Sequence, residues 1–438
     1  MLTLSGLPYI RLRFNKDGHL ADGAPSTYAP SAAVTDLIVM SHGWHQDPDD
    51  AEVMYGKMLE HFQAEGGAAG PGRKYGVIGI FWPSDQFRDD LSQEVVAVLG
   101  DQPGAASAAA GQPVDLDKLK ARAKAIADLL GVDPDTLSRQ AVRAADLRSQ
   151  GDANNMVTLL RGAVGTSGDQ DLAAEHGAIL DSDTDGWALV QQLQSSGATQ
   201  GDAVADGGAQ AIDPEQATGS ALGIFGGVAA AVATVLNQFA YFELKKRAGL
   251  VGQSLGGLLD SGDLGHVERL HFVGHSFGAR LVTAAASVMT ARAPYSLTLV
   301  QAAFSHNAFG EKIKGNVNGA FRNVVANNRF HQRIVVSHTW NDHAVGLLYA
   351  IASRASGDIA KGVFRVTPTF GGQDDIHGAM GANGPQKLQT VSAHARDYDG
   401  AAGLSLGAGI HSLKCDFIKG HNDIRTAQVG RLLKAAFA

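Results

Sequence analysis

The sequence predicts an α/β protein with a mostly parallel central sheet and helices on both faces, and three observations lead to that prediction. The apolar runs TDLIVMS and YGVIGIF, at residues 35–41 and 75–81, have the length of buried strands. Residues 50–66 between them carry apolar side chains at helical spacing, which completes a strand–helix–strand unit. Further strand-like runs follow helical segments at residues 268–273, 296–304, 332–340 and 412–420.

The remaining segments divide the chain into a sheet domain and an insertion. Residues 8–20 predict a first strand and hairpin, and residues 423–438 a terminal helix. No strong strand pattern occurs from residue 91 to 239, where helices are expected within 114–132, 133–150 and 183–194. We therefore expect a sheet domain at 1–92 and 241–438, and a mainly helical insertion at 93–240 as a candidate cap or lid.

Composition narrows the classes of function and compartment. The net charge of −8 argues against a general affinity for nucleic acid or acidic membranes. Cys415 is the sole cysteine of the chain, so no intrachain disulfide forms, which fits a reducing compartment. The N-terminus lacks a basic segment followed by a long apolar one, so no signal peptide is expected. A cytoplasmic location is the expectation, with secretion by a non-classical route left open.

Residues 221–236, ALGIFGGVAAAVATVL, form the most apolar segment of the chain. The run has 16 residues, fewer than the roughly 20 that a membrane-spanning helix needs, and no basic residue precedes it closely. We expect a buried or lid helix, with membrane contact through 221–236 as the alternative.

The motif GHSFG places Ser276 between Gly274 and Gly278. The match alone is weak, but a strand-like run precedes it and a helix rich in small residues follows it. In a nucleophile elbow, the serine adopts a strained conformation and its neighbours must be small because strand and helix approach closely. Ser276 is therefore the expected nucleophile, and a simple glycine turn is the alternative.

A serine nucleophile needs an imidazole base and a carboxylate that orients it. In elbow hydrolases these follow in the order serine, acid, histidine, each at the carboxyl end of a strand. Asp342 comes just after the run 332–340, and His421 just after the run 412–420. They are the expected acid and base; a helix-capping aspartate and an exposed turn histidine are the alternatives.

The oxyanion hole needs two backbone N–H groups. The elbow supplies that of Phe277, and the His-Gly step after residues 35–41 makes the N–H of Trp44 the expected second donor; a plain strand-to-helix loop is the alternative. Four histidines near these motifs are candidates for the substrate pocket, and a hydrogen-bonded structural role is the alternative for His306: His42, His45, His275 and His306.

Together these motifs, in this order, resemble the α/β-hydrolase superfamily of serine esterases and lipases. The resemblance covers about residues 8–81 and 242–438 and implies an eight-stranded, mostly parallel sheet. It assigns the triad roles to Ser276, Asp342 and His421, and the oxyanion hole to Trp44 and Phe277. Two departures stand out: the insertion precedes the elbow, and His45-Gln46 replaces a glycine-rich or proline-bearing stretch.

The expected activity is hydrolysis of carboxylic esters, acyl or aryl and including bulky or polymeric ones, without a cofactor. A membrane-acting lipase, an amidase or thioesterase with the same triad, and a non-catalytic binding protein are the alternatives. Metal binding by Asp374, Asp375 and His377 is not expected, because the chain has no H-E-x-x-H motif and one cysteine excludes a CxxC pair. Oligomeric state is left open.

Overall fold

The computed structural model describes most of the sheet domain and part of the insertion. The described residues are 2–21, 27–44, 47–68, 70–84, 116–145, 150–165, 185–191, 228–327, 329–342, 344–348 and 371–438.

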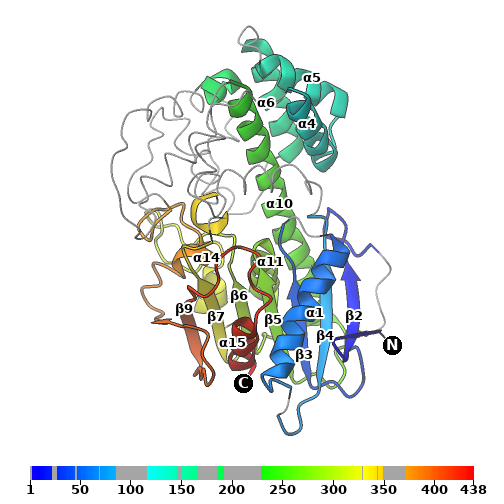
Figure 1. Ribbon diagram of the computed structural model, residues 1–438, viewed down its shortest axis with the longest axis vertical. Coiled ribbons are helices and arrows are strands. Elements are labelled where there is room, and N and C mark those ends of the chain that lie inside the picture. The colour runs from blue at the N-terminus through cyan, green and yellow to red at the C-terminus, as the bar shows by residue number, and fades with distance from the viewer. Residues whose placement is uncertain are drawn as a thin grey trace.

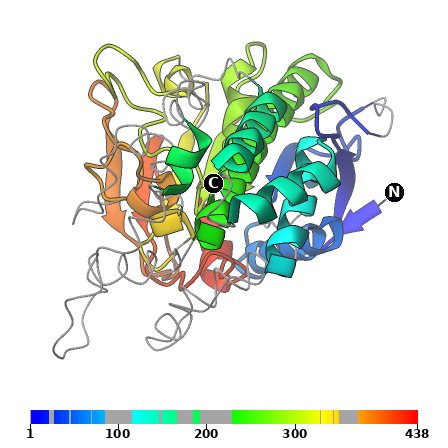
Figure 2. The same ribbon diagram turned by 90° about the horizontal axis from the view of Figure 1, so that it is seen from above.

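Within these residues the chain forms one nine-stranded sheet, in the order β1-β2-β4-β3-β5-β6-β7-β9-β8. β1 pairs antiparallel with β2, and every other neighbouring pair is parallel. Figure 2 shows the two ends of the sheet, blue β1 and orange β8 and β9, on opposite sides of the molecule. The strands are β1 (Leu2–Leu4), β2 (Leu7–Arg13), β3 (Asp36–Ser41), β4 (Tyr75–Phe81), β5 (Arg269–His275), β6 (Ser296–Val300), β7 (Arg333–His338), β8 (Ala393–Asp397) and β9 (Gly409–Lys414).

Helices cover both faces, and the central strands are therefore apolar on both sides. Leu37 and Val39 of β3 belong to one hydrophobic core, whereas Ile38 and Met40 belong to the other, as the two-residue period of a strand requires. α1 (Pro48–Ala64) and α15 (Ala427–Phe437) pack together over one face. α10 (Val228–Ser261) and α11 (Phe277–Val288) cover the other. The prediction of a mostly parallel α/β sheet with helices is confirmed.

Two strand predictions need correction. The last predicted strand, 412–420, is β9 at Gly409–Lys414, which places His411 inside the strand. The segment around His394 and Asp397, left without a strand, forms the edge strand β8. Its side chains are mostly exposed, so it lacks the apolar pattern from which a strand is recognised.

The described part of the insertion is a helical bundle at one end of the molecule (Figure 1). It contains α4 (Leu116–Leu130), α5 (Pro134–Ala145) and α6 (Gln150–Val164), all in contact with α10. α10 has 34 residues, a length of about 50 Å, and runs without interruption across residue 240 from the bundle to α11. One continuous helix thus joins the insertion to the elbow helix.

The described part of the segment weighed for membrane contact, residues 228–236, forms the start of α10. Residues 221–227 lie outside the described residues, and Ala231, Val232, Val235 and Leu236 of α10 are buried in the hydrophobic core. No described helix is long and apolar enough to cross a membrane.

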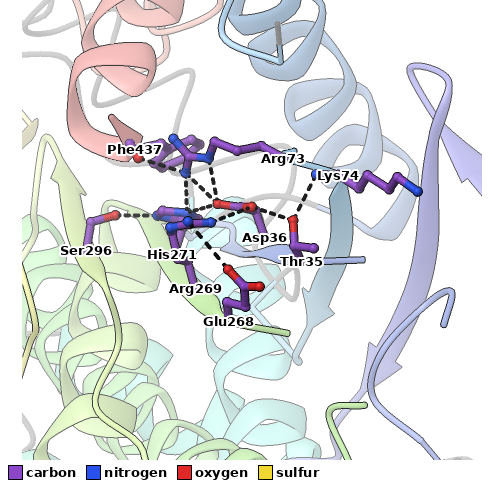
Figure 3. Close-up of polar contacts among 9 residues, drawn as sticks. All are labelled: Thr35, Asp36, Arg73, Lys74, Glu268, Arg269, His271, Ser296 and Phe437. Atoms are coloured by element: carbon purple, nitrogen blue, oxygen red, sulfur yellow. Dashed lines mark hydrogen bonds and ion pairs between the residues drawn. The ribbon is translucent and has the colours of Figure 1, made fainter. Parts of the chain in front are cut away.

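A buried polar network joins the amino ends of the central strands (Figure 3). Asp36, fully buried at the start of β3, accepts hydrogen bonds from Arg73 Nε at 2.9 Å and Arg269 Nη1 at 3.2 Å. His271 Nε2 lies 3.3 Å from the same carboxylate, and Arg73 also donates to the carbonyl of Phe437 at the end of α15. The network holds the amino ends of these strands together, and the predicted site lies at their carboxyl ends.

Three short helical segments complete the described fold. The π-helix η2 (Ala344–Leu348) follows Asp342, and α14 (Met380–Asn383) contacts η2 and β7. α12 (Arg322–Ala326) lies between β6 and β7 in the chain and contacts α11.

Candidate active site

Ser276 lies on a strained turn between β5 and α11. Its φ and ψ are 58° and −126°, and this non-glycine residue therefore adopts a sparsely populated conformation. Three backbone hydrogen bonds of 3.1 Å hold it: its N–H donates to Val300, and its carbonyl accepts from Ala279 and Ala303. The first turn of α11 and the segment at the end of β6 thus hold Ser276 in this strained conformation.

The two flanking glycines are required by close packing. A Cβ on Gly274 would lie 2.5 Å from the backbone N of Ala279. A Cβ on Gly278 would lie 2.5 Å from the carbonyl oxygen of His42. Neither φ is positive, so the close approach of strand, helix and loop, rather than backbone freedom, excludes a side chain at both positions.

Asp342 and His421 form a hydrogen-bonded pair at the carboxyl edge of the sheet. His421 Nδ1 lies 2.7 Å from Asp342 Oδ2. Because the carboxylate can only accept, Nδ1 carries the proton, and Nε2 of the neutral ring is the basic nitrogen. The His421 ring centroid is 4.7 Å from that of His275, the residue that precedes Ser276. The pair therefore lies next to the elbow.

The Asp342 carboxylate is buried, but both of its oxygens accept hydrogen bonds from protein groups. Its Oδ1 accepts from the N–H groups of Ala344 and Val345 at 3.1 and 3.3 Å, and its Oδ2 accepts from Gln301 Nε2 at 3.1 Å. Burial raises the pKa of this carboxyl group, but His421 and Gln301 lower it, and the net pKa lies below the ordinary value. Asp342 is therefore ionised at neutral pH.

The loop after β3 contacts Ser276 directly. A Cβ on Gly43 would lie 2.5 Å from Ser276 Cβ, so only glycine fits there. Phe277 is the first residue of α11, and its N–H, in the first turn, has no intrahelical partner. The Trp44 ring packs against Phe277 at 6.1 Å and against Tyr241 of α10 at 6.4 Å between centroids. The two expected oxyanion donors thus belong to segments that flank Ser276.

His42 supports this loop from inside the fold. Its ring is buried and stacks on Trp82 at 5.6 Å, and its Nδ1 donates to the Gly43 carbonyl at 2.9 Å. Burial lowers its pKa to about 4, so the ring is neutral. The neighbouring candidate His45 lies outside the described residues.

His275 and His306 are also buried and hydrogen-bonded. His275 Nε2 donates to the carbonyl of His421 at 2.8 Å, and burial lowers the pKa of His275 to about 3. His306 Nδ1 accepts from Asn383 Nδ2 at 3.1 Å, and burial lowers the pKa of His306 to about 4. Both rings hold the loops around the site, which is the structural role weighed for His306 from the sequence.

Sequence reasoning missed two residues of this constellation. Gln301 was placed inside a strand at 296–304, but β6 ends at Val300 and Gln301 reaches Asp342. Its signal was a lone polar residue in an apolar run. Tyr241 carried no signal, because its contact with Trp44 exists only after α10 packs on the sheet domain.

His421 follows β9 at a greater distance than expected. β9 ends at Lys414, and residues 415–425 form the loop that carries His421. The loop is anchored to the loop that carries Asp342, because Asn341 Nδ2 donates to the Asp416 carbonyl at 3.0 Å and Thr339 Oγ1 donates to Asp416 Oδ1 at 2.8 Å.

Among the described residues, no group of three or more histidine, cysteine, aspartate or glutamate side chains has a geometry that could hold a metal ion. Asp375 instead accepts from the N–H groups of Gly371 and His377, at 2.7 and 3.0 Å.

No protein-family model, no curated protein and no solved structure matches the chain.

Proposed function

We propose that the protein is a serine hydrolase of carboxylic esters, with Ser276 as nucleophile, His421 as base and Asp342 as orienting acid, on an α/β-hydrolase fold. The observation that carries the proposal is a serine held at φ 58° on a strand-to-helix turn, next to a histidine whose Nδ1 is bonded to a buried carboxylate. A strained serine and an oriented imidazole at one sheet edge are what acyl transfer requires.

The first half of the proposed reaction forms an acyl-enzyme. His421 Nε2 takes the hydroxyl proton of Ser276 as Oγ attacks the ester carbonyl carbon. The N–H groups of Phe277 and Trp44 stabilise the negative charge on the carbonyl oxygen. The intermediate then collapses, the bond to the leaving oxygen breaks, and protonated His421 returns the proton to it, so that an alcohol departs.

The second half hydrolyses the acyl-enzyme. His421 takes a proton from water, the hydroxide oxygen attacks the acyl carbon, and the bond to Ser276 Oγ breaks as His421 returns the proton to Oγ. The products are a carboxylic acid and free enzyme. In both halves Asp342 keeps the proton on Nδ1 of His421 and stabilises the imidazolium, without itself taking a proton.

Two alternatives keep the same residues. Amides and thioesters would be cleaved by the same steps. Lipid engagement through 221–236 is weakened as an alternative, because the described part of that segment is buried in the core and presents little surface to a membrane.

The direct experiment is hydrolysis of p-nitrophenyl esters from acetate to palmitate, with a matched amide and thioester, by wild type, Ser276→Ala and Ser287→Ala. Ser287 lies on the same helix, and its hydroxyl bonds only locally to the Ala284 carbonyl in the contacts described, so it controls for serine removal. We expect Ser276→Ala to lose on the order of 10⁶ in kcat and Ser287→Ala to keep wild-type rates. Equal rates in wild type and Ser276→Ala would overturn the proposal.

A further inference from the structure

Gln301 is a buried, strained residue at the carboxyl end of β6. Its φ is 46°, a left-handed conformation that costs a non-glycine residue energy, and its side chain is fully buried. Strain of this kind persists where the surroundings over-determine the conformation, and it concentrates at functional sites. Ala303, two residues on, donates to the Ser276 carbonyl, so the segment is also tied to the elbow.

The hydrogen bonds of Gln301 determine which end of its amide faces the acid. The Ser337 hydroxyl oxygen accepts from the Gln301 backbone N–H at 3.3 Å, and the same hydroxyl donates to Oε1 at 3.1 Å. Because Oε1 is thereby occupied as an acceptor, the NH₂ group faces Asp342 Oδ2, at 3.1 Å. The carbonyl of Gly381, at 3.4 Å from Nε2, also requires a donor there.

Asp342 Oδ2 is therefore shared between two side-chain donors, Gln301 Nε2 and His421 Nδ1. The two backbone N–H groups on Oδ1 come from η2, directly after the acid, so they locate the carboxylate relative to its own loop. Gln301 directly follows a different strand, β6, and it locates the carboxylate relative to the strand ends beside Ser276.

We infer that Gln301 is a positioning residue that holds Asp342 Oδ2 toward Nδ1 of His421, with Ser337 fixing the orientation of the Gln301 amide. The inference rests on the proposed hydrolase function. Asp342 is thus oriented from the end of β6 as well as from its own loop. The tautomer of His421 then depends on the Gln301 amide, which lies outside the proposed triad.

The first test compares Gln301→Leu and Gln301→Glu with Thr298→Val. Thr298 is a buried residue of β6, and its hydroxyl has no hydrogen-bond partner among the residues that the structure describes, so its variant controls for a change in the core of β6. We expect Gln301→Leu to lower kcat about 10- to 100-fold, with KM changed less than about twofold, since a hydrogen bond to a charged group is lost. Thr298→Val should keep wild-type kinetics.

Gln301→Glu keeps the shape but replaces a donor by a carboxyl group. It would face the ionised Asp342, so one carboxyl group must hold a proton or the two repel. The charged and titratable groups around this pair are His421, His275 and Arg425. As the pH rises, the two neighbouring carboxyl groups lose the proton that they share and begin to repel each other. We expect the activity of Gln301→Glu to decline at that pH, whereas wild-type activity does not decline there.

The second test uses coupling. If Gln301 acts through Asp342, Gln301→Leu should have almost no further effect on kcat in an Asp342→Asn background. If Ser337 acts through Gln301, the Ser337→Ala and Gln301→Leu effects should be strongly non-additive. Additive losses in both cycles would overturn the inference and indicate that Gln301 only fills the core.

A measurement without substrate separates this inference from the proposed function. NMR of ¹⁵N-histidine-labelled protein reports whether the His421 ring holds its proton on Nδ1. We expect Gln301→Leu to reduce that tautomer relative to wild type and Thr298→Val, and an unchanged His421 signal would overturn the positioning role. A changed signal in a protein that cleaves no ester would support positioning and contradict only the hydrolase proposal.

Discussion

The Nε2–H of His275 donates to the backbone carbonyl of His421 at 2.8 Å, which ties the residue before the proposed nucleophile to the residue that carries the proposed base. The two come from β5 and from the loop after β9, strands separated in the sheet by β6 and β7. Because burial lowers the pKa of His275 to about 3, its ring is neutral at neutral pH and can donate only from the nitrogen that faces this carbonyl.

Removing this hydrogen bond should loosen the loop that carries His421, the proposed base. We predict that His275→Phe, which keeps an aromatic ring but loses the donor, lowers kcat about 3- to 10-fold. Hydrogen exchange of residues 415–425 should become faster, as measured by mass spectrometry. His394→Phe, at an exposed position on β8, is the control. Unchanged exchange in His275→Phe would show that the contact does not hold the loop.

The close contact between Gly43 and Ser276 leads to a second prediction, on the effect of a side chain at residue 43. A methyl group at Gly43 would lie 2.5 Å from Ser276 Cβ, so Gly43→Ala must displace either Ser276 or the loop with the Trp44 N–H. We predict a loss of at least about 100-fold in kcat, the effect of losing one oxyanion donor. The rate of ester hydrolysis is measured, and thermal unfolding of the same variant reports its stability.

Gly257→Ala is the matched control for this substitution. Gly257 lies within α10, and a Cβ there meets nothing within 4 Å. Alanine should therefore stabilise the helix by about 0.5–1 kcal/mol and leave activity unchanged. Full activity of Gly43→Ala would mean that the loop does not support Ser276 as the proposed nucleophile.

Much of this arrangement could be predicted from sequence, for local reasons. The run before Ser276 has a strand pattern and the helix after it has small residues, so the elbow is visible within 18 residues. Asp342 stands close to the end of a strongly apolar strand for the same reason.

The rest depends on contacts between distant segments. The Gln301–Asp342 and Tyr241–Trp44 pairs form only when strands and helices are assembled, and neither residue has a distinctive local pattern. The exposed edge strand β8 offers no apolar alternation. α10 begins at Val228 and crosses the predicted domain boundary after residue 240, because its apolar residues continue to the bundle and burial against α4, α5 and α6 stabilises the longer helix.

The free energy of unfolding should decrease as the pH is lowered, because several histidines are buried. Burial lowers the pKa of four rings, to about 4 for His42, His271 and His306 and about 3 for His275. An unfolded histidine has a pKa near about 6.5. The unfolded chain therefore binds more protons between pH 6.5 and 4, so the free energy of unfolding decreases as pH falls through that window, by about 1.4 kcal/mol per pH unit for each ring.

The variant that tests this sign is His271→Gln, in the network of Figure 3. It should reduce the slope of unfolding free energy against pH by about 1.4 kcal/mol per pH unit between pH 6 and 4.5, as measured by urea unfolding. Asp36 acts at lower pH: burial raises its pKa, but His271 and Arg73 hold it below the ordinary value, so its contribution is lost only as pH falls below about 4. An unchanged slope in His271→Gln would contradict a neutral, buried ring.

The central claim is that Ser276 is a nucleophile activated by the His421–Asp342 pair. The most direct measurement is reaction with a fluorophosphonate, followed by intact-mass determination and peptide mapping. We predict one phosphonyl adduct on Ser276, formed much more slowly in Asp342→Asn and absent in Ser276→Ala. No adduct on the wild-type protein, or equal labelling of Ser276→Ala, would contradict the account.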